Sequence, residues 1–195
     1  MRGGRPPQSM SRIPYPCWGL TLTNPVSDAE QLVTSLLDWR KSERWLILGG
    51  PAAVSEKQLW TAWLGLASRH ANSKMRANAL DVEFIRLIAG THQIRIGFER
   101  AGVVEGDQTA WLVYLPEFAD KTISEMDWPD LNRVALDQEA DRLMRVLDAK
   151  LLPHAPIPRE ESVQRLELQV EDDRSIDHES IERSALAHIA LADFN

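Results

Sequence analysis

Short apolar stretches bounded by turn residues predict strands at four places in the chain. Residues 45–48 are continuously apolar and are closed by Gly49-Gly50-Pro51, which predicts a buried strand followed by a break. Alternation of apolar and polar positions predicts a strand over residues 18–23 and an edge strand over residues 163–170. The clearest strand pattern covers residues 110–115, and Pro116 ends it.

Apolar residues spaced three and four apart predict helices between these strands. Ser27 and Glu30 have the spacing of a capping box and begin the first helix, and Ser55 begins the second. Trp128-Pro-Asp begins a later helix, and Asp177 caps the last one. The predicted helices cover residues 27–39, 55–67, 78–89, 91–101, 128–151 and 177–191.

Two of these helices meet at a very tight corner. Asn78 and Asp81 favour the start of a helix, and Gly90 is placed to stop it in a left-handed conformation. Thr91 then caps the next helix at once, and Gly102 ends it. The sequence therefore predicts two helices joined by a Gly-Thr corner.

The length of 195 residues favours one domain, because two separate cores would each be small. Residues 1–16 are rich in Gly, Pro, Ser and Arg without apolar periodicity, which predicts a disordered arm before a single domain over residues 17–195. The protein carries 22 Lys and Arg against 29 Asp and Glu, a net charge of −7. Residues 68–100 carry 6 basic against 3 acidic residues, whereas residues 101–195 carry 9 against 21. A local basic region inside an acidic chain can still meet nucleic acid, although weakly.

The sequence lacks the residue patterns of several kinds of site, including metal centres, phosphate loops and catalytic serines. Cys17 is the only cysteine, so one chain builds neither a disulfide nor a thiolate zinc cluster, and the five histidines lack the spacing of metal ligands. Gly49-Gly50 is not followed by the Gly-Lys-Ser/Thr of a phosphate loop, and no Gly-x-Ser-x-Gly corner occurs. The first residues lack the apolar stretch of a signal peptide, and no apolar run approaches the length of a membrane span. We expect a cytoplasmic protein without catalytic activity, cofactor or metal.

The Gly-Thr corner is the best candidate for a binding site. The first backbone N–H groups of a helix that starts near Thr91 point outward and carry the positive end of its dipole, which suits a phosphate. Amide side chains can read base edges, while Lys and Arg contact phosphates. The candidate RNA-binding residues are Lys74, Arg76, Asn78, Thr91, His92, Gln93 and Arg95.

Two other interpretations of this corner stay open on the sequence. In the first, Thr91 is only a helix cap and Gln93 only a brace. In the second, the two helices are a DNA-reading helix-turn-helix, although the turn of that motif is usually longer.

The stretch from Glu83 to Val103 resembles the family of the KEOPS subunit that binds the small atypical kinase of that complex. The family shows a helix with a glutamate, then Ser/Ala-Gly-x-x-Gln-Ile, then a helix ending near a glycine, and Glu83, Gly90, Gln93, Ile94 and Gly102 match. Ala89 replaces the commoner serine, and His92 stands where arginine or a polar residue is common. The similarity extends more loosely from Trp18 to Phe194 and includes the last helix.

The resemblance implies a fold and a role. The implied fold is α+β, with one small, mostly antiparallel sheet packed with several helices. The implied role is a non-catalytic subunit that holds the unpaired CCA tail of a tRNA while another subunit adds threonylcarbamoyl to the adenosine beside the anticodon. The resemblance also implies a contact with the kinase-like ATPase subunit, carried by Ile181, Leu186 and Ile189 of the last helix.

Two rival functions remain open. The chain could be a protein-interaction module that binds the kinase subunit without an RNA groove, which predicts equal affinity for tRNA with and without its tail. It could also be a small enzyme, which predicts a pocket with titratable groups of perturbed pKa away from Gly90.

Overall fold

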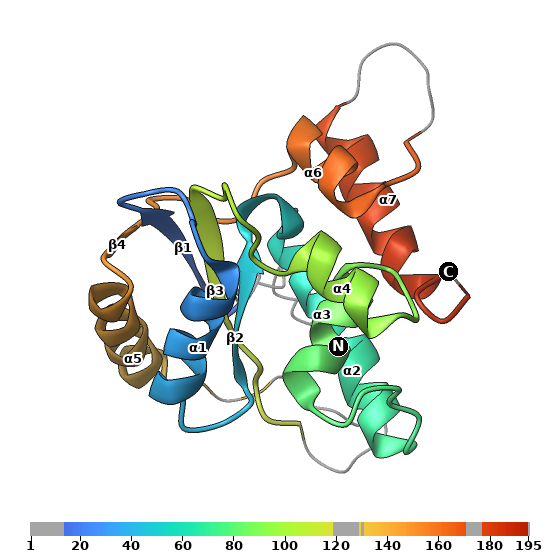
Figure 1. Ribbon diagram of the computed structural model, residues 1–195. Helices are drawn as coiled ribbons and strands as arrows, with labels where there is room; N and C mark the ends of the chain where they lie inside the picture. The colour runs from blue at the N-terminus through green and yellow to red at the C-terminus, as the bar shows by residue number, and fades with distance from the viewer. Residues whose placement is uncertain (1–13, 119–128, 130, 171–176, 195) are drawn as a thin grey trace, which may run out of the picture.

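A four-stranded antiparallel sheet forms the centre of the protein (Figure 1). The computed structural model describes residues 14–118, 129, 131–170 and 177–194. Within them the strands lie in the order β2-β3-β1-β4, with Ile47 of β2 opposite Leu112 of β3 and Leu20 of β1 opposite Leu151 of β4. Their bounds are β1 Cys17–Leu22, β2 Trp45–Gly49, β3 Thr109–Tyr114 and β4 Ala149–Leu151. The α+β fold implied by the resemblance is confirmed.

Helices cover both faces of the sheet, which explains the continuous apolar runs of its inner strands. Successive residues of a strand point to opposite faces, so Trp45 and Ile47 belong to one core while Leu46 and Leu48 belong to the other. Figure 1 shows α1 and α5 on one side of the sheet and α2 and α3 on the other. The helices are α1 Ala29–Trp39, η1 Gly50–Ala52, α2 Glu56–Ala71, α3 Leu80–Ile88, α4 Ile94–Ala101, α5 Arg133–Val146, α6 Glu160–Leu166 and α7 His178–Ala190.

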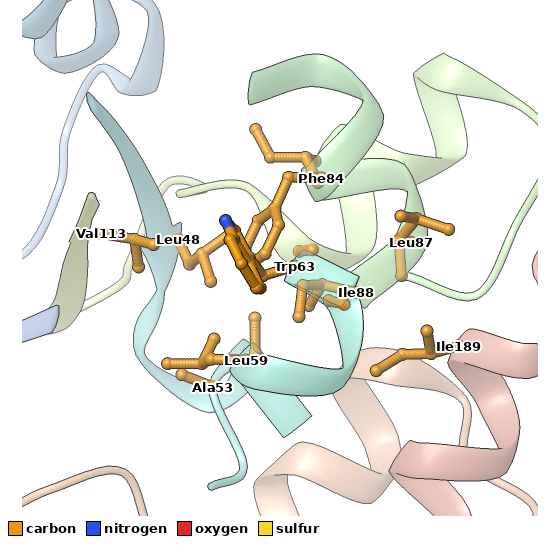
Figure 2. Close-up of a cluster of buried hydrophobic side chains, with 14 of the residues drawn as sticks. Leu48, Ala53, Leu59, Trp63, Phe84, Leu87, Ile88, Val113 and Ile189 are labelled. Carbon is orange, nitrogen blue, oxygen red and sulfur yellow. The ribbon is translucent and has the colours of Figure 1, made fainter. Parts of the chain in front are cut away.

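The larger core lies between the sheet and the helices α2, α3 and α7. Figure 2 shows Trp63 at its centre, with Leu48 and Val113 on the sheet side and Phe84 and Ile88 on α3. Each of these five side chains is at most 1% exposed. The corner after α3 therefore lies beside the larger core.

The predicted edge strand over residues 163–170 is wrong. Residues 160–166 form α6, because Ser162 and Leu166, four residues apart, are the buried positions. Glu167 then adopts a left-handed conformation with φ of 53° and ends the helix, after which Leu168 packs into the core. The last apolar position of the helix, Leu166, and the first one after it, Leu168, are two residues apart and so imitate the alternation of a strand.

The predicted helix over residues 128–151 is too long. Trp128 lies outside the described residues, and α5 begins at Arg133, where the Asn132 side chain accepts the N–H of Ala135 at 3.1 Å. Asp148 has a φ of 48° and separates α5 from β4. The strand β4 was missed because three residues carry too little periodicity to be recognised.

The predicted arm over residues 1–16 ends too late. Residues 1–13 lie outside the described residues, but Tyr15 is 1% exposed and Pro16 is buried. The Tyr15 ring meets Trp60 edge-on, with ring centroids 4.7 Å apart. The packed part of the chain therefore begins before residue 17.

Candidate nucleic-acid interface

The end of α3 and the start of α4 form a tight turn centred on Gly90. The N–H of Gly90 donates to the Leu87 carbonyl at 3.1 Å, and the N–H of Thr91 donates to the Arg86 carbonyl at 3.3 Å. These two bonds, with a φ of 60° at Gly90, are those of a Schellman motif. The prediction that Gly90 stops the helix in a left-handed conformation is confirmed.

The second helix of the corner begins later than predicted, at Ile94 instead of Thr91. The Thr91 hydroxyl accepts the N–H of Gln93 at 3.1 Å, so a local side-chain turn replaces the first helical residues. Thr91 is 2% exposed and its side chain cannot line a surface groove. Gln93, which is exposed, occupies the N-cap position of α4 without a side-chain capping bond.

Beneath the corner lies a fully buried ion pair between two residues of α3. Arg86 Nη2 lies 2.5 Å from Glu83 Oε1, and both side chains have no exposed surface. Burial lowers the pKa of Arg86, but the hydrogen bond and the charge of Glu83 outweigh it, so that the pKa of Arg86 is raised. A paired and hydrogen-bonded arrangement of this kind is the one in which buried charges are tolerated.

The same ion pair joins three segments of the chain. Glu83 Oε2 accepts the backbone N–H groups of Arg76 and Ala77 at 3.1 and 3.0 Å. Arg86 Nη1 donates to the carbonyls of Thr91 and Ala192 at 2.9 and 3.0 Å. The segment before α3, the corner after it and the turn after α7 are therefore fixed to one another.

A layer of partly exposed charges covers this buried pair. Asp193 accepts from Arg69 Nη2 at 2.9 Å and lies 3.4 Å from Arg76 Nε and 3.0 Å from Arg86 Nη2. Arg76 is 50% exposed, and Arg69 is 18% exposed. Three guanidinium groups therefore surround the carboxylates of Glu83 and Asp193. This cluster of two acids and three arginines has a net positive charge.

One side of the corner is closed by α7. His188 Nε2 lies 2.8 Å from the carbonyl oxygen of Ala89, and a Cβ atom added at Gly90 would come within 2.0 Å of the His188 ring. Burial lowers the pKa of His188, and it outweighs the opposing effect of the bond to Ala89. The His188 side of the corner is therefore covered by α7.

The predicted RNA-binding residues differ in their exposure and in their contacts. Arg76 and Arg86 both lie against Asp193, and Arg86 also donates to the Thr91 carbonyl, so the two predicted segments are neighbours. Arg95 is 79% exposed on α4 and pairs with Glu99 at 2.6 Å. The remaining predicted residues, Lys74, Asn78, His92 and Gln93, are exposed.

The predicted partner-binding residues of the last helix are mostly core residues. Ile181 and Ile189 are 1% and 3% exposed, and Figure 2 shows Ile189 at the α7 side of the core. The assignment of these two side chains to a partner surface is therefore wrong, because α7 uses its apolar face to pack on α2 and α3. Leu186 is half-buried.

Sequence reasoning missed Arg69, Arg86 and Asp193. A signal was present for Arg86, which interrupts an apolar run and stands three residues after Glu83, on the same side of a helix. Asp193 gave no signal, because it is far from the arginines in the sequence.

The rest of the described chain offers little reactive chemistry. Burial and the charge of Glu56 raise the pKa of Cys17 to about 12, with Arg133 opposing them, so the thiol is protonated at neutral pH. Two surface hollows of about 290 and 360 Å³ lie beside α5, away from the corner. The second contains Tyr114, whose pKa burial raises. Residues that could together hold a metal ion are not found within the described ranges.

No described helix has the length and apolar character to cross a bilayer. Comparison with protein-family models and with curated proteins finds no match for this chain.

Proposed function

We propose that this protein is a non-catalytic cytoplasmic subunit that binds the unpaired CCA tail of a tRNA and the kinase-like ATPase of a KEOPS complex. In this role it supports threonylcarbamoyl modification of the adenosine beside the anticodon, as its resemblance to the KEOPS accessory family implies. The observation that carries the proposal is the Glu83–Arg86 pair, which fixes residues 76–77 next to the corner at Thr91. We infer that the exposed amide and cationic side chains of these two segments lie on one surface.

This surface suits a single-stranded RNA end. Splayed nucleotides expose base edges to the amides of Asn78 and Gln93, whereas a duplex hides them. Lys74 and Arg76 are exposed and can meet phosphates. A chain of net charge −7 gives no broad attraction, so we expect a few local phosphate contacts and a shallow salt dependence.

The test compares one tRNA with and without its CCA tail. Binding is measured by anisotropy at several salt concentrations, and we expect the intact tRNA to bind at least about tenfold more tightly, a difference of roughly 1.4 kcal/mol. Equal affinity for the two RNAs would reject the tail site.

A charge-reversal experiment then locates the surface. The double change Arg76→Glu, Arg95→Glu is expected to weaken binding and to reduce the slope of log affinity against log salt by roughly 0.7 per lost phosphate contact. The matched control is Arg142→Glu, Arg183→Glu, which alters the net charge equally at two arginines that are 59% and 71% exposed on α5 and α7. An equal loss in both double variants would mean that only the total charge matters.

A protein-interaction module without an RNA groove is the second candidate. Four large apolar side chains favour it: Ile94 and Phe98 on α4 are 42% and 40% exposed, and Leu191 and Phe194 after α7 are 49% and 83% exposed. Ile94 and Phe98 are four residues apart and share one face of their helix. For this candidate we expect Phe98→Ser to abolish binding of the kinase subunit while tRNA with and without the tail binds equally.

A further inference from the structure

The carboxylate of Asp193 lies in a cradle made by three arginines, which we call the arginine cradle: Arg69, Arg76 and Arg86. Arg69 Nη2 donates to Oδ2 at 2.9 Å, while Arg86 Nη2 and Arg76 Nε lie 3.0 and 3.4 Å from Oδ1. The three guanidinium groups come from α2, from the segment before α3 and from α3. Of these contacts the one from Arg69 is a hydrogen bond, and buried Asp193 Oδ1 accepts none from the described residues. The forked donors of several arginines around one anion are the groups by which arginine binds phosphate.

The Asp193 carboxylate does not provide a partner for every arginine N–H group, nor a charge for every arginine. Buried Arg69 Nε lies 3.7 Å from Glu83 Oε1 and has no hydrogen-bond partner among the described residues. Glu83 and Asp193 supply two negative charges against three positive ones. Burial raises the pKa of Asp193, but the hydrogen bond and charge of Arg69, with Arg86, outweigh it and hold it below the ordinary value, so the group is an anion at neutral pH.

The occupant belongs to a partly exposed turn whose backbone has anchors of its own. Asp193 is 35% exposed and belongs to a short turn after α7, next to Phe194, which is 83% exposed. The turn is anchored separately, by buried Ala192 and by the bond from Arg86 to the Ala192 carbonyl. A rotation of the Asp193 side chain would open the cradle while Arg86 stays bound to Glu83 and Thr91.

We propose that the arginine cradle is a phosphate-binding site for the backbone of the bound RNA, and that Asp193 occupies it as an internal competitor until RNA displaces the carboxylate. The inference rests on the proposed function and extends it, since Arg69 and Arg86 lie outside the predicted groove. The phosphodiester supplies one negative charge with two free oxygens, so it replaces the carboxylate without loss of charge.

The first arm of the test measures RNA binding by Asp193→Asn. Removing the competitor is expected to tighten binding of a tRNA with its CCA tail by roughly three- to tenfold at low salt and to leave the tail preference in place. The matched control is Glu179→Gln, which removes one charge from α7 at a carboxylate that is 81% exposed and pairs with Arg183. Unchanged or weaker binding by Asp193→Asn, with the tail preference retained, overturns the cradle but leaves the proposed function standing.

The second arm uses inorganic phosphate and does not depend on RNA. At constant ionic strength, phosphate is expected to raise the melting temperature of Asp193→Asn more than that of the wild type or of Glu179→Gln. Stabilisation of Asp193→Asn without any tRNA binding by the wild type would keep the cradle as an anion site and reject the RNA function. Equal shifts in all three proteins would overturn the site.

A further variant decides the question if Asp193→Asn does not fold. Arg69→Gln keeps much of the side-chain length on α2, and its folding is verified by circular dichroism. It is expected to lower the affinity for RNA and to reduce the salt slope by roughly 0.7, the share of one phosphate contact. An unchanged slope in a folded Arg69→Gln overturns the proposal.

Discussion

Replacing Gly90 by alanine is expected to lower the free energy of unfolding by about 2 to 5 kcal/mol, for two reasons that can be separated. The first is conformational, because Gly90 has a φ of 60° and a residue with a Cβ atom is strained there. The second is steric, because the new Cβ would lie 2.0 Å from the Cδ2 atom of His188. Since real Cβ contacts are never this short, the imidazole ring has to move.

The two contributions can be estimated from the contacts. The left-handed conformation costs a non-glycine residue about 1 to 2 kcal/mol. Displacing the His188 ring breaks the bond between His188 Nε2 and the Ala89 carbonyl, 2.8 Å long, which leaves a buried acceptor unpaired at a cost of about 1 to 3 kcal/mol. The two parts are therefore of similar size.

Gly106 provides a matched control for this substitution. Its φ is 89°, and a Cβ atom added there would meet nothing within 4 Å, so Gly106→Ala carries only the conformational cost. Urea unfolding at 25 °C, analysed by linear extrapolation, measures both variants. In the His188→Ala background, Gly90→Ala is expected to cost no more than Gly106→Ala, which gives a coupling energy of about 2 kcal/mol. Equal losses for Gly90→Ala and Gly106→Ala in the wild-type background would refute the packing of His188 over the corner.

Three further predictions concern the stability and the chemistry of buried groups. Glu83→Gln breaks the buried pair with Arg86 and is expected to cost about 3 to 5 kcal/mol in the same urea assay, because it removes the fully buried counter-ion of Arg86 and leaves only the partly exposed Asp193. The pKa of His188 is lower in the folded than in the unfolded protein. As the pH falls, the unfolded state therefore protonates this imidazole at a higher pH than the folded state does. The free energy of unfolding of the wild type is therefore expected to fall as the pH drops from 7 to 5, and that of His188→Gln is expected to fall by less. An identical pH dependence in the two proteins would contradict this prediction. Cys17, with a pKa of about 12, is expected to react with a thiol reagent at pH 8 at least about a hundredfold more slowly in the folded protein than in urea, as an absorbance assay would show.

The sequence predicted those elements whose periodicity is long and whose ends carry turn or capping residues. Ser55 begins α2 as expected and accepts the N–H of Gln58 at 3.1 Å, and the strand at Trp45 is buried on both faces. Errors arose where two patterns overlapped or where an element was very short. Residues 163–170 imitate a strand because α6 ends at a left-handed Glu167, a conformation that sequence rules do not anticipate at a glutamate.

The candidate site was predictable in its position but not in its construction. Gly90 and the basic residues before α3 located the corner correctly, because helix termination is a local property. The Thr91 side chain is buried and its hydroxyl accepts the N–H of Gln93. A threonine can form such a local turn or cap a helix that starts directly after it, and the sequence does not favour either bond. The partners of Arg86 lie as far away as Ala192, and contacts over such separations depend on the packing of α7.

The buried pair also determines how functional tests on this surface have to be interpreted. Glu83 and Arg86 have no exposed surface while Asp193 covers Arg86, and they hold residues 76–77 and the Thr91 carbonyl in place. A change at either residue is therefore expected to lower stability and RNA binding together, and it cannot distinguish a binding residue from a structural one. Substitutions at half-exposed Arg76 and at exposed Gln93 remove possible RNA contacts while leaving this support intact. Loss of binding in those variants with an unchanged unfolding transition is the result that assigns the surface to the ligand.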